Sequence, residues 1–285
     1  MASEERKPPR VLLTAFPDHF SLPVRPSAST AAVQDAHRQT NFLLRAELAE
    51  FEKLMNLQLR VVAAQSRTRG AHAAAILSFW SRAYMGLADA CNLMTYGSYA
   101  SCPPLLRTTL DCIAVQRSLV GDGFAEYEDW FPGGVSHLGA AVAFDLGRYR
   151  AASAVVSDER LGLLYRLLSD LTMPHLGSTL FLASPEAGLQ KLPIGFADSS
   201  FHLGWAQLIT GWLLHLAVVQ LETALSAPDI SIDKALRSDC EAAPRDLAHV
   251  LDDSRRCHAM EEDGHIVLHN FRRASTGQPK QIVLI

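Results

Sequence analysis

The stretch AHAAAILSFWSRAYMGLADACNLMTYGSYASCPPLLRTTLDCIAVQRSLV, residues 71–120, predicts two helices joined by a short turn. In its first half, apolar side chains recur at steps of three and four residues, the spacing of one buried helical face: Ile76, Phe79, Trp80, Ala83, Leu87, Ala90, Cys91 and Met94. Gly97-Ser98 then ends the first helix. Pro103-Pro104 fits the first turn of the second helix, where a missing N–H loses no partner. Two helices joined this closely pack antiparallel, so we expect this hairpin to be the scaffold of the fold.

Four of the charged side chains on this hairpin form two pairs that share a helix face. Arg107 and Asp111 are four residues apart on the second helix, so they share a face and can form an ion pair. Arg82 and Asp89 are seven residues apart on the first helix and also share a face. Buried charges are costly unless they are paired and hydrogen-bonded. We therefore expect either a satisfied ionic network inside the protein or a polar pocket that opens to solvent.

The rest of the chain is also mostly helical in pattern. One helix without glycine or proline is predicted from Ser29-Thr30 to about residue 65, as the longest of the fold. Further helices are predicted at residues 124–134, 136–150, 158–171, 201–225 and 244–260, with a loop at 183–199 and a connector at 228–243. The runs HIVLHNF and KQIVLI, separated by RRASTGQP over residues 265–285, predict a β-hairpin.

The predicted fold class is therefore all-α, a multi-helix bundle with a small C-terminal β-hairpin. We expect an extended, proline-rich N-terminal arm at residues 1–27, ordered only where residues 11–16 or Phe20 pack on the body. The helical bundle would follow at residues 28–260 and the β-hairpin tail at residues 261–285.

The helix at residues 201–225 is apolar all round. Residues 199–221 contain no Asp, Glu, Lys or Arg, which is long enough for a membrane span. Polar residues interrupt the run, and no Lys/Arg cluster flanks it: Gln207, Thr210, His215 and Gln220. A helix of this kind is typical of the buried centre of a bundle, so we expect no membrane partner. A membrane-associated accessory protein is the alternative.

Composition limits the class of protein further. At 285 residues, 48% hydrophobic and 20% charged, the chain can bury a sizeable core. A formal net charge of −4 argues against broad, charge-driven binding of nucleic acid. Five cysteines without a CxxC motif indicate a reducing compartment. The N-terminus lacks the layout of a secretory signal, so we expect a cytoplasmic protein.

Two segments carry a family resemblance. LLRTTLD at residues 105–111 follows the turn GSY at residues 97–99, and YRLLSDLTMPH runs from Tyr165 to His175. Together they resemble uncharacterised bacterial helical families near the HEPN-like domains, in which a glycine-aromatic turn leads into Leu-Leu-Arg-x-x-Leu-Glu and a Tyr-x-x-Leu-Ser segment leads to a histidine. Here an aspartate, Asp111, replaces the glutamate, and Pro-His replaces His-Pro. The resemblance implies a helical bundle linked to stress or phage-defence systems.

Two enzymatic alternatives stay open. Arg67 and His72 have the spacing that HEPN ribonucleases use, although this composition produces such pairs by chance. A metal-dependent enzyme would need several histidines beside Asp89 or Asp111. The histidines in apolar surroundings are His137, His175, His202 and His215. Lone histidines on apolar helices are more often hydrogen-bonded core residues, so we predict no metal site. The chain also lacks a P-loop, a GxGxxG and a GxSxG motif.

The sequence thus favours a cytoplasmic, homo-oligomeric, non-enzymatic binding protein. Its expected site consists of six residues: Arg107, Asp111, Tyr165, His175, Asp89 and Arg82. Arg107 would contact a small anionic ligand or a protein partner, because a guanidinium suits anions. The pattern names no cofactor and no catalytic residue.

Overall fold

The predicted helical hairpin is present, and its two helices share the most extensive contact among the described helices. In the computed structural model, which describes residues 17–65, 71–120, 155, 157–185 and 191–284, α3 (Ala71–Thr95) and α4 (Cys102–Val120) are joined through the short 3₁₀ helix η1 (Tyr99–Ser101). Gly97 turns the chain with a φ of +76°, a conformation that favours glycine. A side chain at this position would also overlap the carbonyl group of Ser199, so the turn is packed as well as tight.

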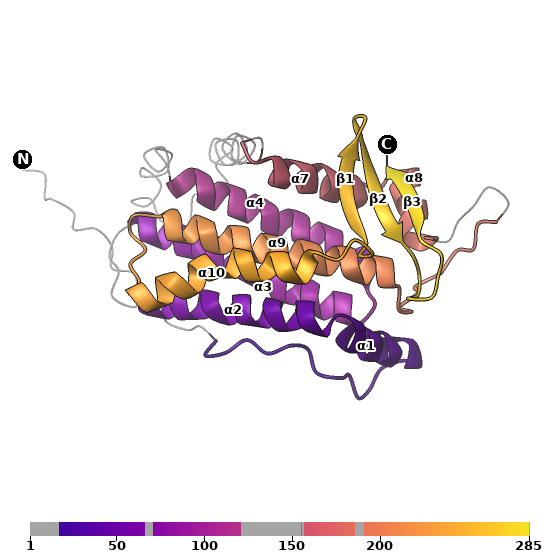
Figure 1. Ribbon diagram of the computed structural model, residues 1–285, viewed down its shortest axis with the longest axis horizontal. Coiled ribbons are helices and arrows are strands. Elements are labelled where there is room, and N and C mark those ends of the chain that lie inside the picture. The colour runs from indigo at the N-terminus through magenta and orange to yellow at the C-terminus, as the bar shows by residue number, and fades with distance from the viewer. Residues whose placement is uncertain (1–16, 66–70, 121–154, 156, 186–190, 285) are drawn as a thin grey trace, which may run out of the picture.

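The other described elements complete the bundle and its small sheet. The further helices are α1 (Ala31–Leu43), α2 (Arg45–Ala64), α7 (Glu159–Thr172), α8 (Leu176–Ala183), α9 (Leu203–Ser226) and α10 (Lys234–Leu251). In Figure 1 the long helices run side by side, and a small sheet lies with α8 at one end of the bundle. The predicted fold class is confirmed, with the sheet one strand larger than expected. The two helices predicted at residues 124–134 and 136–150 lie outside the described residues.

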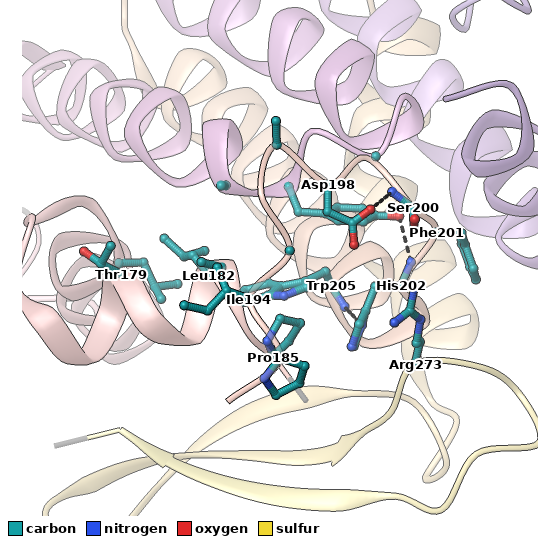
Figure 2. Close-up of a pocket in the computed structure, with 18 of the residues that line it drawn as sticks. Thr179, Leu182, Pro185, Ile194, Asp198, Ser200, Phe201, His202, Trp205 and Arg273 are labelled. Atoms are coloured by element: carbon teal, nitrogen blue, oxygen red, sulfur yellow. Dashed lines mark hydrogen bonds between the residues drawn. The ribbon is translucent and has the colours of Figure 1, made fainter. Parts of the chain in front are cut away.

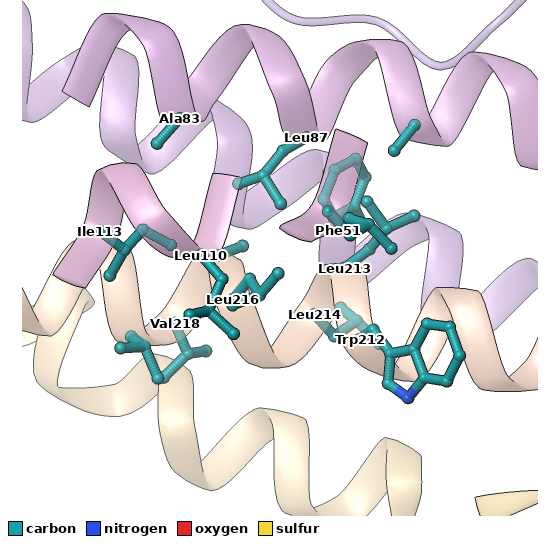
Figure 3. Close-up of a cluster of buried hydrophobic side chains, with 14 of the residues drawn as sticks. Phe51, Ala83, Leu87, Leu110, Ile113, Trp212, Leu213, Leu214, Leu216 and Val218 are labelled. Atoms are coloured by element: carbon teal, nitrogen blue, oxygen red, sulfur yellow. The ribbon is translucent and has the colours of Figure 1, made fainter. Parts of the chain in front are cut away.

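Helix α9 is the centre of the bundle. Eighteen of its 24 residues are buried, and α2, α3, α4 and α10 pack on it. Figure 3 shows Phe51 of α2, Leu87 of α3 and Leu110 of α4 meeting Leu213 and neighbouring side chains of α9. Among the described helices, α9 is the one whose length and hydropathy would also suit a membrane span, but 78% of that window is buried inside the protein. The predicted core helix is confirmed.

The prediction of one helix from residue 29 to 65 is wrong, because two helices, α1 and α2, cover this range. The cap is as predicted, with Thr30 accepting a hydrogen bond from Val33 N. At Leu44, however, the backbone leaves helical geometry (φ −114°, ψ 29°), and α2 starts anew. The Leu44 side chain is fully buried and α1 turns to contact α3. Tertiary packing here overrides a local preference for one straight helix.

The predicted connector at residues 228–243 and helix start at Pro244 are also wrong. Helix α10 begins ten residues earlier, at Lys234, where Asp233 accepts a hydrogen bond from Leu236 N at 2.8 Å. Pro244 lies inside the helix although it has no N–H to donate. The helix continues because one face stays buried on both sides of the proline: Leu236, Cys240, Ala243 and Leu247.

The C-terminal hairpin is confirmed, and a third strand joins it. Strands β1 (His258–Glu262), β2 (His265–Phe271) and β3 (Lys280–Leu284) form an antiparallel sheet in the order β1-β2-β3. The predicted helix end at residue 260 is wrong, because α10 ends at Leu251 and residues 258–260 belong to β1. The sheet is attached to α9 through its backbone, because the first N–H groups of α9 donate to carbonyls just after β2.

The approach of α3 to α4 leads to a stability prediction. A Cβ at Gly86 would overlap Thr109 Oγ1, which is itself held by a hydrogen bond to Leu105 O at 2.8 Å. We expect Gly86→Ala to lower the free energy of unfolding by about 1–2 kcal/mol, because overpacking outweighs the better helix propensity of alanine.

Urea denaturation of a double-mutant cycle measures this effect. Thr109→Ala removes the obstructing hydroxyl, so Gly86→Ala should be neutral or stabilising in that background. An equal loss of stability in both backgrounds would contradict the close approach of the two helices.

Candidate functional site

A pocket of about 630 Å³ lies between the end of α7, helix α8 and the start of α9. Its walls are largely aromatic, prolyl and aliphatic: Tyr99, Leu171, Leu182, Pro185, Pro193, Ile194, Phe201 and Trp205. Polar groups are fewer: Thr172, Thr179, Asp198, Ser200, His202 and Arg273. Figure 2 shows Leu182, Pro185 and Ile194 toward one side, and Asp198, His202 and Arg273 toward the other. This size and lining are typical of small-molecule sites in proteins.

The corner between α7 and α8 forms the first wall. Met173-Pro174 ends α7, and His175 caps α8 by accepting a hydrogen bond from Ser178 N at 3.3 Å. The Ser178 hydroxyl also donates to Met173 O at 2.9 Å, which fixes the corner. Since Leu171, Met173 and Pro174 all line the pocket, these caps set the shape of this wall.

The second wall is the segment at residues 191–200, which is tied back to the end of α8. Ser184 Oγ donates to Pro193 O at 2.6 Å, and Gly195 N donates to Ala183 O at 2.8 Å. The segment thus stands against α8 through two hydrogen bonds, although it has little regular secondary structure of its own.

The floor is the first turn of α9. His202 caps this helix by accepting a hydrogen bond from Trp205 N at 3.3 Å, and His202 N donates to Tyr99 Oη at 3.3 Å. The Phe271 ring lies against both His202 and Trp205, with ring centroids 4.7 and 5.5 Å apart. Leu203 N donates to the carbonyl of Arg273 at 2.9 Å. The N–H groups of this turn are therefore occupied, so the helix terminus does not offer them to an anion.

One side of the rim carries two opposite charges. Ser200 N donates to Asp198 Oδ1 at 2.8 Å, and the Ser200 hydroxyl and N–H hold the pKa of the Asp198 carboxyl below its usual range. Arg273 and His202 lower this pKa further through their charge. Within the described chain, the exposed Arg273 guanidinium makes neither a hydrogen bond nor an ion pair. The carboxylate and the guanidinium are thus close enough to influence each other without being directly paired.

Three of the residues predicted for the site do come together, at the interface of α4 and α7. Arg107 forms the predicted ion pair with Asp111, and its Nε donates to Ser169 Oγ at 2.8 Å. Its guanidinium also lies over the Tyr165 ring, 3.7 Å from the centroid. None of these side chains lines the pocket, but Pro104, one turn before Arg107, does. The cluster holds α4 against α7 behind the pocket wall.

The other predicted residues lie elsewhere. His175 Nε2 is 2.6 Å from Asp170 Oδ1, and its role is to cap α8. The expected burial of Arg82 and Asp89 is wrong, because both are exposed on α3. Each precedes a buried alanine of the core stripe, at Ala83 and Ala90. One residue is 100° of helix rotation, enough to move a side chain from the core to solvent.

The residues of the enzymatic alternatives have other contacts. His72 Nδ1 is 2.6 Å from Asp229 Oδ2, and its Nε2 is 2.5 Å from Leu119 O, so both ring nitrogens have partners. Arg67 and His137 lie outside the described residues. Among the residues that the structure describes, no group of three His, Cys, Asp or Glu side chains could hold a metal ion.

A second pocket, of about 290 Å³, lies between α7, α9 and the segment that leads into β1. Its lining includes five leucines, Trp212 and the partly buried His215, whose Nε2 has no hydrogen-bond partner among the residues that the structure describes. Burial lowers the pKa of His215 to about 4; the nearby Arg160 adds to this, and Asp158 opposes it. This histidine is therefore neutral at pH 7.

We expect His215 to make the protein acid-sensitive. An unfolded histidine titrates near 6.5, so between pH 6.5 and 4 the unfolded state binds more protons than the folded state. The free energy of unfolding should therefore fall by about 2 kcal/mol between pH 7 and 4.5 through this group alone.

Urea denaturation at both pH values measures the free energy of unfolding of wild type and His215→Phe. The fall of about 2 kcal/mol between pH 7 and 4.5 should be absent from the variant. The matched control is His249→Phe, which changes an exposed histidine on α10 and should leave it in place. Parallel pH profiles for wild type and His215→Phe would contradict the assignment.

Comparison with protein-family models, curated proteins and solved structures finds no match to this chain. The resemblance to HEPN-like families stays a prediction from the sequence.

Proposed function

We propose that the protein binds a small organic molecule in the pocket between α7, α8 and α9. The observation that carries this proposal is the pocket itself, about 630 Å³ with apolar walls and a few polar groups at one side. An apolar ligand body would lie against Leu182, Pro185 and Ile194, and its polar end would face Asp198 and Arg273. Apolar contact would supply affinity, and the polar groups would fix the orientation of the ligand.

The chemistry of the polar groups favours binding over catalysis. The lowered pKa of Asp198 keeps it ionised and makes it a weak base at neutral pH. His202 Nδ1 already accepts the cap hydrogen bond from Trp205 N. We therefore propose a non-enzymatic role. In this reading the Arg107–Asp111 pair is a positioning element that supports the α7 wall from behind, and it is not the binding group expected from the sequence.

We also propose that the protein is cytoplasmic, homo-oligomeric and related to the HEPN-like families. The five cysteines are free and buried, which supports the proposed cytoplasmic location. Large apolar side chains are exposed near the pocket mouth, which supports the proposed homo-oligomer: Met173, Leu176, Leu192, Ile194 and Phe196. The helical bundle and the Arg107–Asp111 pair support a HEPN-like relationship.

Filling the pocket tests the proposal. Leu182→Trp would place an indole ring where the ligand body should lie. The matched control is Met85→Trp, which adds the same ring at a 60% exposed position on α3. The probe is free indole, a neutral fragment that we expect to bind in about the millimolar range.

Saturation-transfer NMR of indole measures binding to the three proteins. We expect transfer with wild type and Met85→Trp, and a loss of at least about fivefold with Leu182→Trp. Equal transfer to all three proteins, or none to wild type, would contradict a ligand site in this pocket.

A further inference from the structure

We infer that the ligand is a zwitterion, a molecule that carries an ammonium group and a carboxylate on a bulky apolar body. The inference rests on the proposed function and names the class of ligand. It depends on the juxtaposition of Asp198 and Arg273 beside the apolar walls of the pocket.

Asp198 is held in place to receive a cation. Its Oδ1 accepts a hydrogen bond from Ser200 N at 2.8 Å, which fixes the carboxylate at the start of the turn into α9. Gly195 leaves room for it, since a Cβ at Gly195 would lie 2.9 Å from Asp198 Cβ and 3.2 Å from Oδ2. A carboxylate offers about four acceptor positions, so Ser200 leaves capacity for an ammonium group.

Arg273 is suited to the carboxylate. Its backbone is fixed, because its carbonyl accepts the hydrogen bond from Leu203 N in the pocket floor. Its side chain lines the pocket and makes no hydrogen bond or ion pair within the described chain. Guanidinium groups bind carboxylates through two parallel N–H···O hydrogen bonds, which gives orientation as well as affinity.

The two signs together select the ligand class. Asp198 and Arg273 both line the pocket and interact electrostatically, yet neither forms an ion pair with another residue of the described part of the chain. A ligand with only a negative charge would be attracted by Arg273 and repelled by Asp198. A ligand with only a positive charge would be attracted by Asp198 and repelled by Arg273. A ligand with both charges satisfies both groups at once.

The apolar wall beside these charges explains the bulky body. Trp205 packs against Phe181 and Phe271, with ring centroids 4.8 and 5.5 Å apart, so its ring is held before any ligand arrives. Tyr99 is buried and bonded to His202 N. Since Trp205 and Tyr99 are almost fully buried, they form a rigid base behind the pocket, and Leu182, Pro185 and Ile194 supply the apolar surface that a ligand body can contact. An aromatic α-amino acid has the ammonium group, the carboxylate and the bulky apolar body.

Three matched probes test the inference by isothermal titration calorimetry. L-Tryptophan carries both charges, tryptamine has the ammonium alone, and indole-3-propionate has the carboxylate alone, on the same indole body. We expect L-tryptophan to bind at least about tenfold more tightly than either analogue.

Charge variants assign the two contacts. Asp198→Asn keeps an acceptor for Ser200 N and should remove the advantage of L-tryptophan over indole-3-propionate. Arg273→Gln should remove the tighter binding of L-tryptophan relative to tryptamine. The matched control is Arg255→Gln, which removes one positive charge, as Arg273→Gln does, at an 81% exposed side chain. It should leave the affinity of L-tryptophan relative to both analogues unchanged.

The outcomes separate the two proposals. Equal or tighter binding of either analogue, or no binding of L-tryptophan while free indole still binds, overturns the zwitterion and leaves the pocket function standing. A preference for L-tryptophan that Asp198→Asn and Arg273→Gln leave unchanged also overturns it. If neither indole nor L-tryptophan binds, the proposed function itself fails.

Discussion

Burial of α9 on every side is the constraint on which the rest of the structure depends. The helix has no charged residue over its first nineteen positions, so no face of it can be left to water at low cost. The hairpin of α3 and α4 covers one side, and α2 and α10 cover the other. Two of its buried polar side chains are bonded inside the protein, since Thr210 Oγ1 donates to Ala206 O at 2.6 Å and Gln220 Nε2 donates to Gln116 Oε1. The core is therefore specific as well as apolar.

The pocket arises where this covering changes. Along most of its length α9 is enclosed by helices, but at its N-terminus the neighbours are the sheet, α8 and the segment at residues 191–200. The junction is fastened from the sheet side by backbone hydrogen bonds to Leu203 and Gly204. It is also fastened by the buried Arg256, which pairs with Glu47 of α2 at 2.5 Å and donates to Gln207 O of α9 at 2.7 Å. A rigid floor with a less regular rim is the usual setting for a binding site.

The sequence predicted what depends on local periodicity. The hairpin and the Arg107–Asp111 pair follow from three- and four-residue spacing, α9 follows from its long apolar run without charges, and all are present. It failed where distant packing decides the outcome, as at Leu44, where no glycine or proline marks the break, and at Pro244, where a buried face continues the helix. Glycine and proline were good guides to turns and poor guides to these two helix boundaries.

Residue spacing in the sequence could not predict the pocket. Its groups come from separate parts of the chain, at Tyr99, Leu182, Asp198, Trp205 and Arg273, and no spacing rule connects them. One signal was available, the run of Asp and two Ser just before the core helix, which is typical of a capped, structured turn. That signal predicts a turn and says nothing of the arginine beyond the second strand. Only the attachment of the sheet to α9 brings Arg273 to Asp198.

Hydrogen exchange of the backbone amides tests the central claim, that α9 is enclosed by the bundle in the folded protein. Enclosure predicts that amides from Ile209 to Leu221 exchange only through global unfolding, with protection equal to the free energy of unfolding measured by urea. It also predicts protection of the Leu203 and Gly204 amides, whose partners are the carbonyls after β2. Exchange of the central α9 amides within minutes, in protein that is otherwise folded, would contradict the account.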